Sequence, residues 1–288
     1  MLLFFVERPS ETLPFLREEV GRRFENEIRL EKVKSVIPSG WHCFLAFVER
    51  SIAREELTSL RRCLFSAKVD VLQIEHRIKN ESLFCFDMDS TLIRQEVVDE
   101  LARFAGVYDE VAAVTREAME GNLNFQESLR KRCAYLRGLS ADSLLKLYPR
   151  LTLNYGVRDL LSELKRRGAK LAVFSGGFTD ILEAFQKDYE IDEVRANVLE
   201  RIDGKLTGGV LGRIVDKDVK RGSLLELREK FGISKREVIA VGDGANDQLM
   251  LAEAGIGIGF HAKEGLKSGI ENWVDFAPMD VLLYLFEG

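Results

Sequence analysis

Apolar runs of strand length alternate with amphipathic stretches along residues 82–288. The runs Leu83–Phe86, Lys170–Phe174 and Val238–Val241 have the length and composition of buried strands. Helical periodicity covers Phe178–Gln186, after the second run, and Ser223–Phe231, before the third. This alternation predicts an α/β fold in which the strands, where they are neighbours, run parallel.

The first strand ends at two carboxylates, Asp87 and Asp89, in the sequence Asp-Met-Asp-Ser-Thr-Leu. In an extended backbone, residues two apart face the same side, so both carboxylates can converge on one point. Converging carboxylates repel each other unless a cation or a shared proton holds them. The motif therefore indicates a metal site at the edge of a sheet. Taken alone, it is equally typical of a capping aspartate in a strand-to-helix turn.

A second acidic cluster follows the third strand, in Gly242-Asp243-Gly244-Ala245-Asn246-Asp247. The glycines allow a tight turn and a close approach of the backbone to a ligand. If the first and third strands are neighbours, Asp87 and Asp243 project into the crevice where open α/β sheets bind ligands. A few carboxylates open to water and to a phosphate are the usual description of a Mg²⁺ site.

Two further features suit a phosphate group. The second strand leads into Ser175-Gly176-Gly177, a predicted turn that offers a hydroxyl and backbone N–H groups at the start of a helix. The alternative is an ordinary helix cap with flexible glycines. Lys220 lies just before the helix Ser223–Phe231, where the helix dipole disfavours a cation. A nearby negative ligand would explain a lysine at this position, and the alternative is an ordinary solvated surface charge.

Together these motifs resemble the haloacid dehalogenase superfamily of aspartate-nucleophile phosphohydrolases, from about Ser82 to the end of the chain. Longer stretches resemble the phosphoserine phosphatases within it. They are residues 87–92, 96–102, 118–125, 128–132, 174–178, 196–197, 203–208 and 241–247. The resemblance implies a Rossmann-like doubly wound parallel sheet over residues 81–288, and Mg²⁺ as cofactor. It also implies hydrolysis of phosphoserine to serine and phosphate, the last step of serine biosynthesis.

The resemblance also implies a role for each motif residue. Asp87 would attack phosphorus and form an aspartyl-phosphate, and Asp89 would act first as general acid and then as general base. The implied Mg²⁺ ligands are Asp87, Asp243 and Asp89, the last through its backbone carbonyl. The implied phosphate contacts are Ser175, Gly176 and Lys220, with Asp247 orienting Lys220 or a metal-bound water and Asn246 touching the phosphate or the attacked group.

Residues from Glu96 to about 150 are nearly all helical in period, which is far more than a crossover between two strands needs. This insertion predicts a helical cap over the crevice, with Ser140-Ala141-Asp142 as a helix N-cap. By resemblance, the cap would select the substrate. Glu96 would bind its ammonium and Arg132 its carboxylate, while Met119 and Phe125 would form an apolar wall. Each of these residues, taken alone, is also an ordinary helix residue.

The first eighty residues have a different organisation. Strands are predicted at Leu2–Val6, Ile28–Ile37, Trp41–Glu49 and Val69–Ile78, and helices at Glu11–Phe24 and Ala53–Ser66. This βαββαβ order is that of a ferredoxin-like α+β domain and resembles ACT-like modules. The turn before the first helix has no glycine, which favours a structural or pairing role over ligand regulation. The open sheet face predicts either a twofold homodimer or packing on the chain's own catalytic domain.

Composition restricts the partners and the compartment. Charged residues make up 31% of the 288 residues and the net charge is −5, which argues against a nucleic-acid partner. The four cysteines lack C-x-x-C spacing, as expected of reduced thiols. The apolar start Met1–Val6 is too short for a signal peptide or a membrane span, so a cytoplasmic location is expected. Two alternatives to a phosphoserine phosphatase stay open: phosphoryl transfer to another alcohol such as homoserine, and a non-catalytic sensor that works through the N-terminal module.

Overall fold

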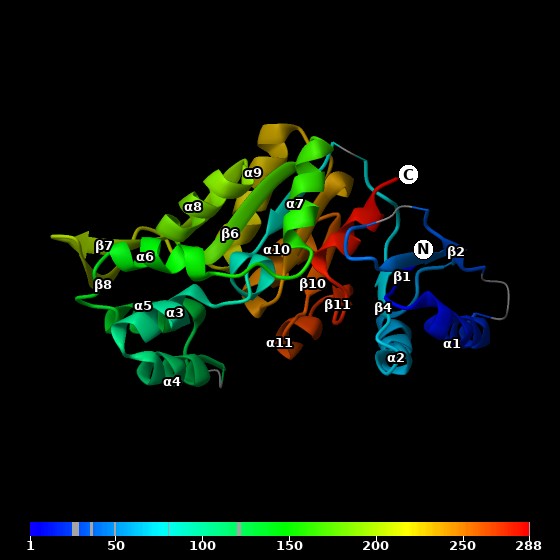
Figure 1. The fold of residues 1–288 in the computed structure, drawn as a ribbon, viewed down its shortest axis with the longest axis horizontal. Coiled ribbons are helices and arrows are strands. Elements are labelled where there is room, and N and C mark those ends of the chain that lie inside the picture. The colour runs from blue at the N-terminus through cyan, green and yellow to red at the C-terminus, as the bar shows by residue number, and fades with distance from the viewer. Residues whose placement is uncertain (25–28, 35–36, 49, 80, 120–121, 288) are drawn as a thin grey trace.

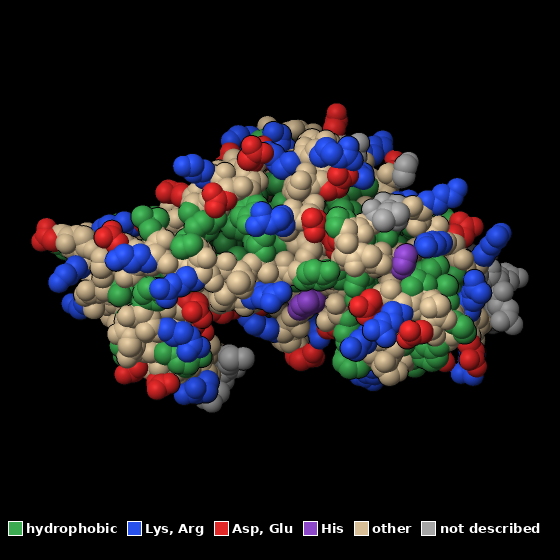
Figure 2. All heavy atoms as spheres, viewed as in Figure 1, with side chains coloured by type: hydrophobic (Ala, Val, Ile, Leu, Met, Phe, Trp, Pro, Cys, Tyr) green, Lys and Arg blue, Asp and Glu red, His purple; other side chains and the backbone are tan. Residues whose placement is uncertain are grey.

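The computed structural model describes residues 1–24, 29–34, 37–48, 50–79, 81–119 and 122–287. A large sheet with flanking helices forms the centre, a group of helices lies at one end, and a small sheet with two helices lies at the other (Figure 1). The N- and C-termini both lie beside the small sheet. On the face shown in Figure 2, acidic and basic side chains are interspersed, so no basic stripe forms there.

The large sheet has seven strands in the order β11-β10-β9-β5-β6-β7-β8. All pairs are parallel except β7 with β8. The strands are β5 (Leu83–Phe86), β6 (Lys170–Phe178), β7 (Glu193–Ile202), β8 (Lys205–Leu211), β9 (Val238–Gly242), β10 (Ile256–Phe260) and β11 (Trp273–Val274). The central strand β5 lies between β6 and β9, so the three predicted strands are indeed parallel neighbours.

Alternate residues of the central strand face two separate cores. Phe84 and Phe86 pack in one core, and Leu83 and Cys85 pack in the other, because side chains of a strand alternate between its faces. The first core includes residues of α7 (Val157–Arg166) and α8 (Thr179–Tyr189), and the second includes residues of α9 (Lys217–Phe231) and α10 (Gln248–Glu253). Helices therefore cover both faces of the sheet, as predicted for an α/β fold.

The predicted cap is a group of helices inserted between β5 and β6. Its helices are α3 (Val97–Ala105), α4 (Tyr108–Met119), α5 (Phe125–Tyr135) and α6 (Asp142–Leu147). The structure assigns no extended strand to the described residues from 96 to 150, and α5 packs on β8. A helix does begin at Ser140-Ala141-Asp142, since α6 starts at Asp142, but the predicted N-cap is absent: Ala141 has helical backbone angles, and no side chain caps that end. Asn124 instead caps α5, in a reciprocal pair with Glu127.

The N-terminal segment folds as a four-stranded antiparallel sheet with two helices. In chain order the elements are β1 (Leu2–Val6), α1 (Pro9–Arg23), β2 (Glu31–Lys32), β3 (His42–Ala46), α2 (Arg54–Phe65) and β4 (Asp70–Gln73). The strand order is β2-β3-β1-β4. The element order matches the predicted one, but β2 is far shorter than Ile28–Ile37, of which residues 28, 35 and 36 lie outside the described part. The ferredoxin-like and ACT-like assignment stays a prediction.

The two faces of this small sheet are both buried. One face packs on α1 and α2, and the other joins the core of the large domain. The Phe5 ring stacks on Tyr284 with centroids 6.2 Å apart, and the Tyr284 hydroxyl donates to the Trp41 carbonyl at 2.7 Å. Of the two predicted alternatives, the structure shows packing on the chain's own catalytic domain, because the C-terminal segment covers this face. The homodimer stays a prediction.

A buried carboxylate fixes the small sheet to the large domain. Asp70 of β4 accepts three backbone N–H hydrogen bonds, from Asp275, Phe276 and Ala277, at 2.7, 3.0 and 2.7 Å. Gln73 and Asn272 exchange two further bonds between side chain and backbone, at 2.8 and 2.7 Å. The N-terminal sheet is therefore part of one continuous body with the large domain.

Two other expectations concern the whole chain. Cys43, Cys63, Cys85 and Cys133 are free thiols, as expected, and Cys85 is fully buried in the sheet. No helix in the described part of the chain has the length and apolar character needed to span a bilayer. The cytoplasmic location stays a prediction.

Candidate active site

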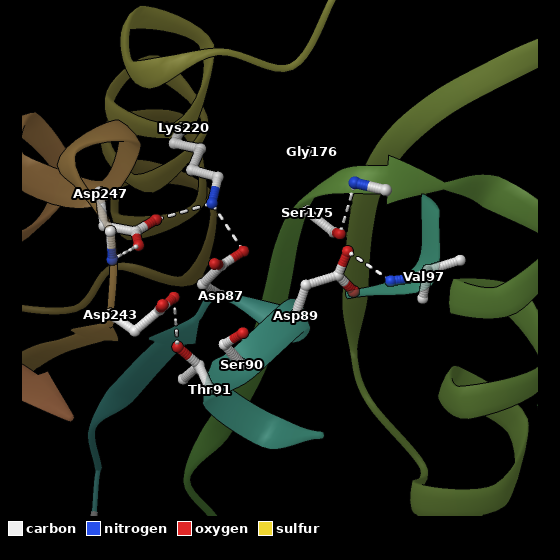
Figure 3. A network of polar contacts seen from close by, with 12 residues as sticks. Asp87, Asp89, Ser90, Thr91, Val97, Ser175, Gly176, Lys220, Asp243 and Asp247 are labelled. Atoms are coloured by element: carbon white, nitrogen blue, oxygen red, sulfur yellow. Dashed lines mark hydrogen bonds and ion pairs between the residues drawn. The ribbon is translucent and has the colours of Figure 1, made fainter. Parts of the chain in front are cut away.

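Three strand ends bring the predicted carboxylates and hydroxyl together. Asp87 follows β5 and Asp243 follows β9. Because Phe86 lies opposite Val241, Asp243 is one residue beyond the position opposite Asp87. The Asp87 N–H donates to the Val241 carbonyl at 2.9 Å, which ties the two loops. Ser175 lies in β6 on the other side of β5 (Figure 3). This is the carboxyl edge of the sheet, where open α/β folds bind ligands.

A buried lysine lies between two of the carboxylates. The Lys220 ammonium is 2.7 Å from Asp87 and 2.6 Å from Asp247, and its side chain has no exposed surface. Figure 3 shows this side chain reaching from α9 to both acids. Lys220 lies within the first turns of α9, which Asp216 caps, so the predicted position before the helix is wrong. Because its side chain is buried, the alternative of a solvated surface charge is wrong as well.

Asp87, Asp243 and Asp247 form a compact acidic cluster. One carboxylate oxygen from each lies within 4.8 Å of the others, and all three residues are buried. Glycine is required beside this cluster, because a Cβ at Gly242 would lie 2.4 Å from the Asp247 carboxyl carbon. Asp247 contacts Lys220 and also belongs to the cluster itself, while its predicted role of orienting Lys220 or a metal-bound water stays a prediction.

Burial and mutual repulsion raise the pKa values of Asp87 and Asp243 in the metal-free protein. Burial, then the neighbouring Asp247, raises the pKa of Asp87 well above its usual value, against the influence of Lys220. Burial likewise raises the pKa of Asp243 to about 6, which the Lys263 ammonium opposes. Burial opposes the charge on Lys220, but Asp247 and Asp87 outweigh it and raise its pKa. The cluster thus holds more negative charge than one lysine neutralises.

A hard divalent cation fits this arrangement. Three carboxylates from two neighbouring strand ends supply the oxygen ligands that Mg²⁺ prefers. A dication would also remove the repulsion that raises the pKa values of Asp87 and Asp243. The Asp89 side chain lies outside the cluster, so the prediction of a backbone-carbonyl ligand at Asp89 stays a prediction.

Asp89 is directed toward the cap rather than toward the cluster (Figure 3). Its Oδ2 accepts from the Val97 N–H at 3.3 Å, while its buried Oδ1 has no hydrogen-bond partner within the described ranges. Burial, and after it the nearby Glu96, raises the pKa of Asp89 well above its usual value. A buried carboxyl with one unoccupied oxygen is suited to pass a proton to a bound group.

The Ser175-Gly176-Gly177 segment is not a turn, contrary to the prediction. Strand β6 continues through it to Phe178, and α8 begins only at Thr179, so neither the predicted turn nor the alternative helix cap is present. The Ser175 hydroxyl accepts from the Gly177 N–H at 2.8 Å. A Cβ at Gly177 would lie 3.2 Å from an Asp89 oxygen, so glycine lets the strand pass close to the acid.

The cap places part of its predicted substrate set at this edge. Phe125 covers Gly176, where a Cβ would lie 2.8 Å from the phenyl ring. Glu96, just before α3, accepts hydrogen bonds from Ser90 at 3.0 Å and from Lys263 at 3.2 Å. The Arg132 Nε on α5 is buried and has no hydrogen-bond partner in the part of the chain that is described.

Two predicted contacts are not placed. Met119 is the last residue of α4, but its side chain lies outside the described part. Asn246 lies half-buried in the short turn Ala245–Asp247, and its contact to a phosphate stays a prediction.

Sequence reasoning missed two polar residues at the site. The Thr91 hydroxyl donates to Asp243 Oδ1 at 3.3 Å, and Lys263 lies 2.9 Å from Asp243 Oδ2. The sequence could have indicated Thr91, because it lies in the same motif as Asp87 and Asp89. Lys263 had no such signal, since it lies in the loop after β10, far from any motif.

Comparison with known proteins agrees with this geometry. Residues 82–255 match the model of the haloacid dehalogenase-like hydrolases. The chain is 42% identical over 226 residues to the phosphoserine phosphatase of Archaeoglobus fulgidus and 46% identical over 207 residues to a probable phosphoserine phosphatase of Schizosaccharomyces pombe. The first match covers 78% of this chain and 66% of the relative, and the second covers 71% of this chain and 70% of the relative. The chain therefore spans about two thirds of the length of these relatives.

Solved structures show the same fold. A HAD family hydrolase from Salmonella enterica serovar Typhi superposes with a TM-score of 0.90 at 28% identity, over 99% of this chain and 98% of that one. A phospho-aspartyl intermediate analogue of phosphoserine phosphatase superposes with a TM-score of 0.68 at 40% identity, over 73% of this chain and all of that one. The chain belongs to the haloacid dehalogenase-like hydrolases and, within them, to the phosphoserine phosphatase family.

Proposed function

We propose that this protein hydrolyses O-phosphoserine to serine and phosphate through a phosphorylated Asp87. The observation that carries the proposal is the carboxyl edge of the sheet, where Asp87 meets Lys220, Asp243 and Asp247 within hydrogen-bond or metal-ligand distance. The relatives named as phosphoserine phosphatases, and the analogue of a phospho-aspartyl intermediate, support the same chemistry.

Asp87 is the proposed nucleophile. Its carboxylate attacks phosphorus, the bond from phosphorus to the serine oxygen breaks, and an aspartyl-phosphate forms, which divides one hard hydrolysis into two easier steps. Lys220 holds Asp87 Oδ1 at 2.7 Å and thereby leaves the second carboxylate oxygen for attack. Mg²⁺, when held by Asp87, Asp243 and Asp247, supplies positive charge that offsets the repulsion between a carboxylate and a phosphate.

Asp89 is the proposed acid and base. Because its pKa is raised, its carboxyl carries a proton that it can give to the departing serine oxygen. The resulting carboxylate then takes a proton from the water that attacks the aspartyl-phosphate. The unpartnered Oδ1 is the atom available for both transfers.

The phosphate and the amino-acid part of the substrate have separate contacts. Ser175 and the Gly176 N–H, on the strand beside β5, are the proposed donors to the phosphoryl oxygens. Glu96 is proposed to bind the ammonium and Arg132 the carboxylate, since a guanidinium grips a carboxylate through two parallel hydrogen bonds. Phe125, which covers Gly176, closes the site toward the cap.

Phosphate release from a panel of phosphoamino acids and sugar phosphates tests this proposal. We expect phosphoserine to be the best substrate and a chelator to abolish turnover. Equal activity on sugar phosphates would reject the roles of Glu96 and Arg132. Adding an alcohol such as homoserine separates hydrolysis from transfer: one free phosphate per serine formed supports hydrolysis, and a phosphorylated alcohol rejects it.

A further inference from the structure

Lys263 is a second cation at the site that the proposed mechanism does not use. Its ammonium lies 2.9 Å from Asp243 Oδ2 and 3.2 Å from Glu96 Oε1. It therefore bridges a proposed metal ligand in the large domain and the proposed ammonium-binding acid at the entrance to the cap. Its backbone is fixed as well, because the Lys263 N–H donates to the Asp243 carbonyl at 2.9 Å.

The two lysines of the site differ in their freedom to move. The Lys220 side chain is fully enclosed, whereas the Lys263 side chain is 55% exposed and the Glu96 side chain 37% exposed. Moving a buried ammonium away from its partners is costly, but an exposed ammonium can turn into water at little cost. Lys263 can therefore leave Glu96 at little cost while its backbone stays in place. It can leave Asp243, whose side chain is only 5% exposed, when another cation takes its place there.

Lys263 occupies the two carboxylates to which the substrate ammonium and the divalent cation are proposed to bind. A phosphoserine ammonium that binds Glu96 would meet the Lys263 ammonium on the same carboxylate, and two like charges repel at that distance. A divalent cation on Asp243 would meet the same repulsion. In the metal-free protein, by contrast, Lys263 supplies positive charge to two acids whose other side-chain hydrogen bonds come from the neutral hydroxyls of Ser90 and Thr91.

We propose that Lys263 is an exchangeable internal counter-ion, which occupies Glu96 and Asp243 until the substrate ammonium takes the first and the divalent cation takes the second. The Glu96 part of this inference rests on the proposed function, since it takes phosphoserine as substrate. Lys263 is thus a positioning residue, which sets the affinity for substrate and metal without touching the reacting atoms.

The test compares Lys263→Met with Lys267→Met in the full-length protein. Methionine keeps much of the lysine stem but removes the charge. Lys267 is a matched control, because it lies four residues further on and pairs with Glu264 and Asp275, outside the site. Lys263→Arg, which retains the charge, serves as the conservative variant.

Two measurements decide the question. The first is the dissociation constant of Mn²⁺, measured by electron paramagnetic resonance without substrate. The second is KM at saturating Mg²⁺ for phosphoserine and for phosphoglycolate, which has a carboxylate and a phosphate but no ammonium. For Lys263→Met we expect Mn²⁺ to bind about three- to tenfold more tightly, because Asp243 then no longer has to release an ammonium before it accepts the cation. We expect the KM for phosphoserine to fall by a similar factor and that for phosphoglycolate to stay within about twofold.

The control and the conservative variant complete the design. Lys267→Met and Lys263→Arg should both retain wild-type values. If Lys263→Met binds Mn²⁺ or phosphoserine no more tightly than the wild type, the counter-ion proposal is overturned. If the wild type does not hydrolyse phosphoserine, the proposed function fails instead, and the Mn²⁺ measurement still decides the exchange at Asp243.

Discussion

Removing the charge of Lys220 should lower the free energy of unfolding of the metal-free protein. The loss should be much larger than that caused by substitution of a surface lysine. In Lys220→Met the carboxylates of Asp87 and Asp247 lose an ammonium at 2.7 and 2.6 Å in a site without solvent. Breaking a buried pair by removing one partner costs about 3–5 kcal/mol, because the remaining charge is left uncompensated. We therefore expect the free energy of unfolding to fall by about that amount at pH 7.5 in the presence of a chelator.

Urea unfolding followed by circular dichroism measures this change directly. Lys230→Met is the matched control, since Lys230 pairs with Glu193 on the surface and its side chain is 53% exposed. Exposed pairs contribute at most about 1 kcal/mol, so the control should stay close to the wild type. Excess Mg²⁺ should restore part of the lost stability of Lys220→Met, because a dication then offsets the two carboxylates. A loss below about 1 kcal/mol in the chelated protein would refute the reasoning that Lys220 neutralises this cluster.

Three further predictions concern the same site and the domain contact. Gly177→Ala places a methyl group 2.9 Å from the Ser175 hydroxyl and 3.2 Å from an Asp89 oxygen, so kcat/KM for phosphoserine should fall by at least about tenfold while circular dichroism stays unchanged. The pKa of Asp243 is raised to about 6, so its carboxyl carries a proton at pH 5 and loses it as the pH rises. Mn²⁺ affinity measured by titration should therefore increase about tenfold from pH 5 to pH 7, and a flat profile would contradict the assignment of Asp243 as a metal ligand. Asp70→Asn replaces one of the oxygens that accept the N–H groups of residues 275–277 with a donor, so the free energy of unfolding in urea should fall by about 2–4 kcal/mol, and an unchanged midpoint would show that this contact does not fix the small sheet.

The sequence pattern predicted the parts of the fold that depend on local periodicity. The central strand Leu83–Phe86 is found as predicted, because its alternate residues face two apolar cores and its end is marked by Asp87. The pairing of Asp87 with Asp243 was also predictable, since both directly follow buried parallel strands. The helical character of the cap was also predictable from its periodicity, although the bounds of its single helices were not predicted.

Features that depend on contacts between distant residues were not predictable. Ser175-Gly176-Gly177 has the composition of a turn, yet β6 stays extended through it because Phe178 pairs with Asn197 of β7. The register shift between Phe174 and Phe178 accommodates the glycines. The extended conformation of this segment follows only from its packing, because glycine permits both a turn and an extended strand locally.

The N-terminal sheet gives the same lesson at a larger scale. The sequence left open whether one face of this sheet pairs with a second copy or packs on the catalytic domain, because no local signal indicates what covers it. Tyr284, at the other end of the chain, stacks on Phe5 and donates to Trp41, and these contacts join residues more than two hundred positions apart. Lys263 was missed for the same reason, since the loop that carries it reaches Glu96 only in the folded protein.

The central claim is that Asp87 carries the phosphoryl group of phosphoserine during turnover. Rapid mixing with phosphoserine labelled in its phosphate, followed by acid quenching, proteolysis and mass spectrometry, tests this claim most directly. The account predicts one labelled peptide, with the phosphate on Asp87, in the wild type and none in Asp87→Asn, which should also lose turnover. Label on any other residue, or near-full turnover by Asp87→Asn, would contradict it.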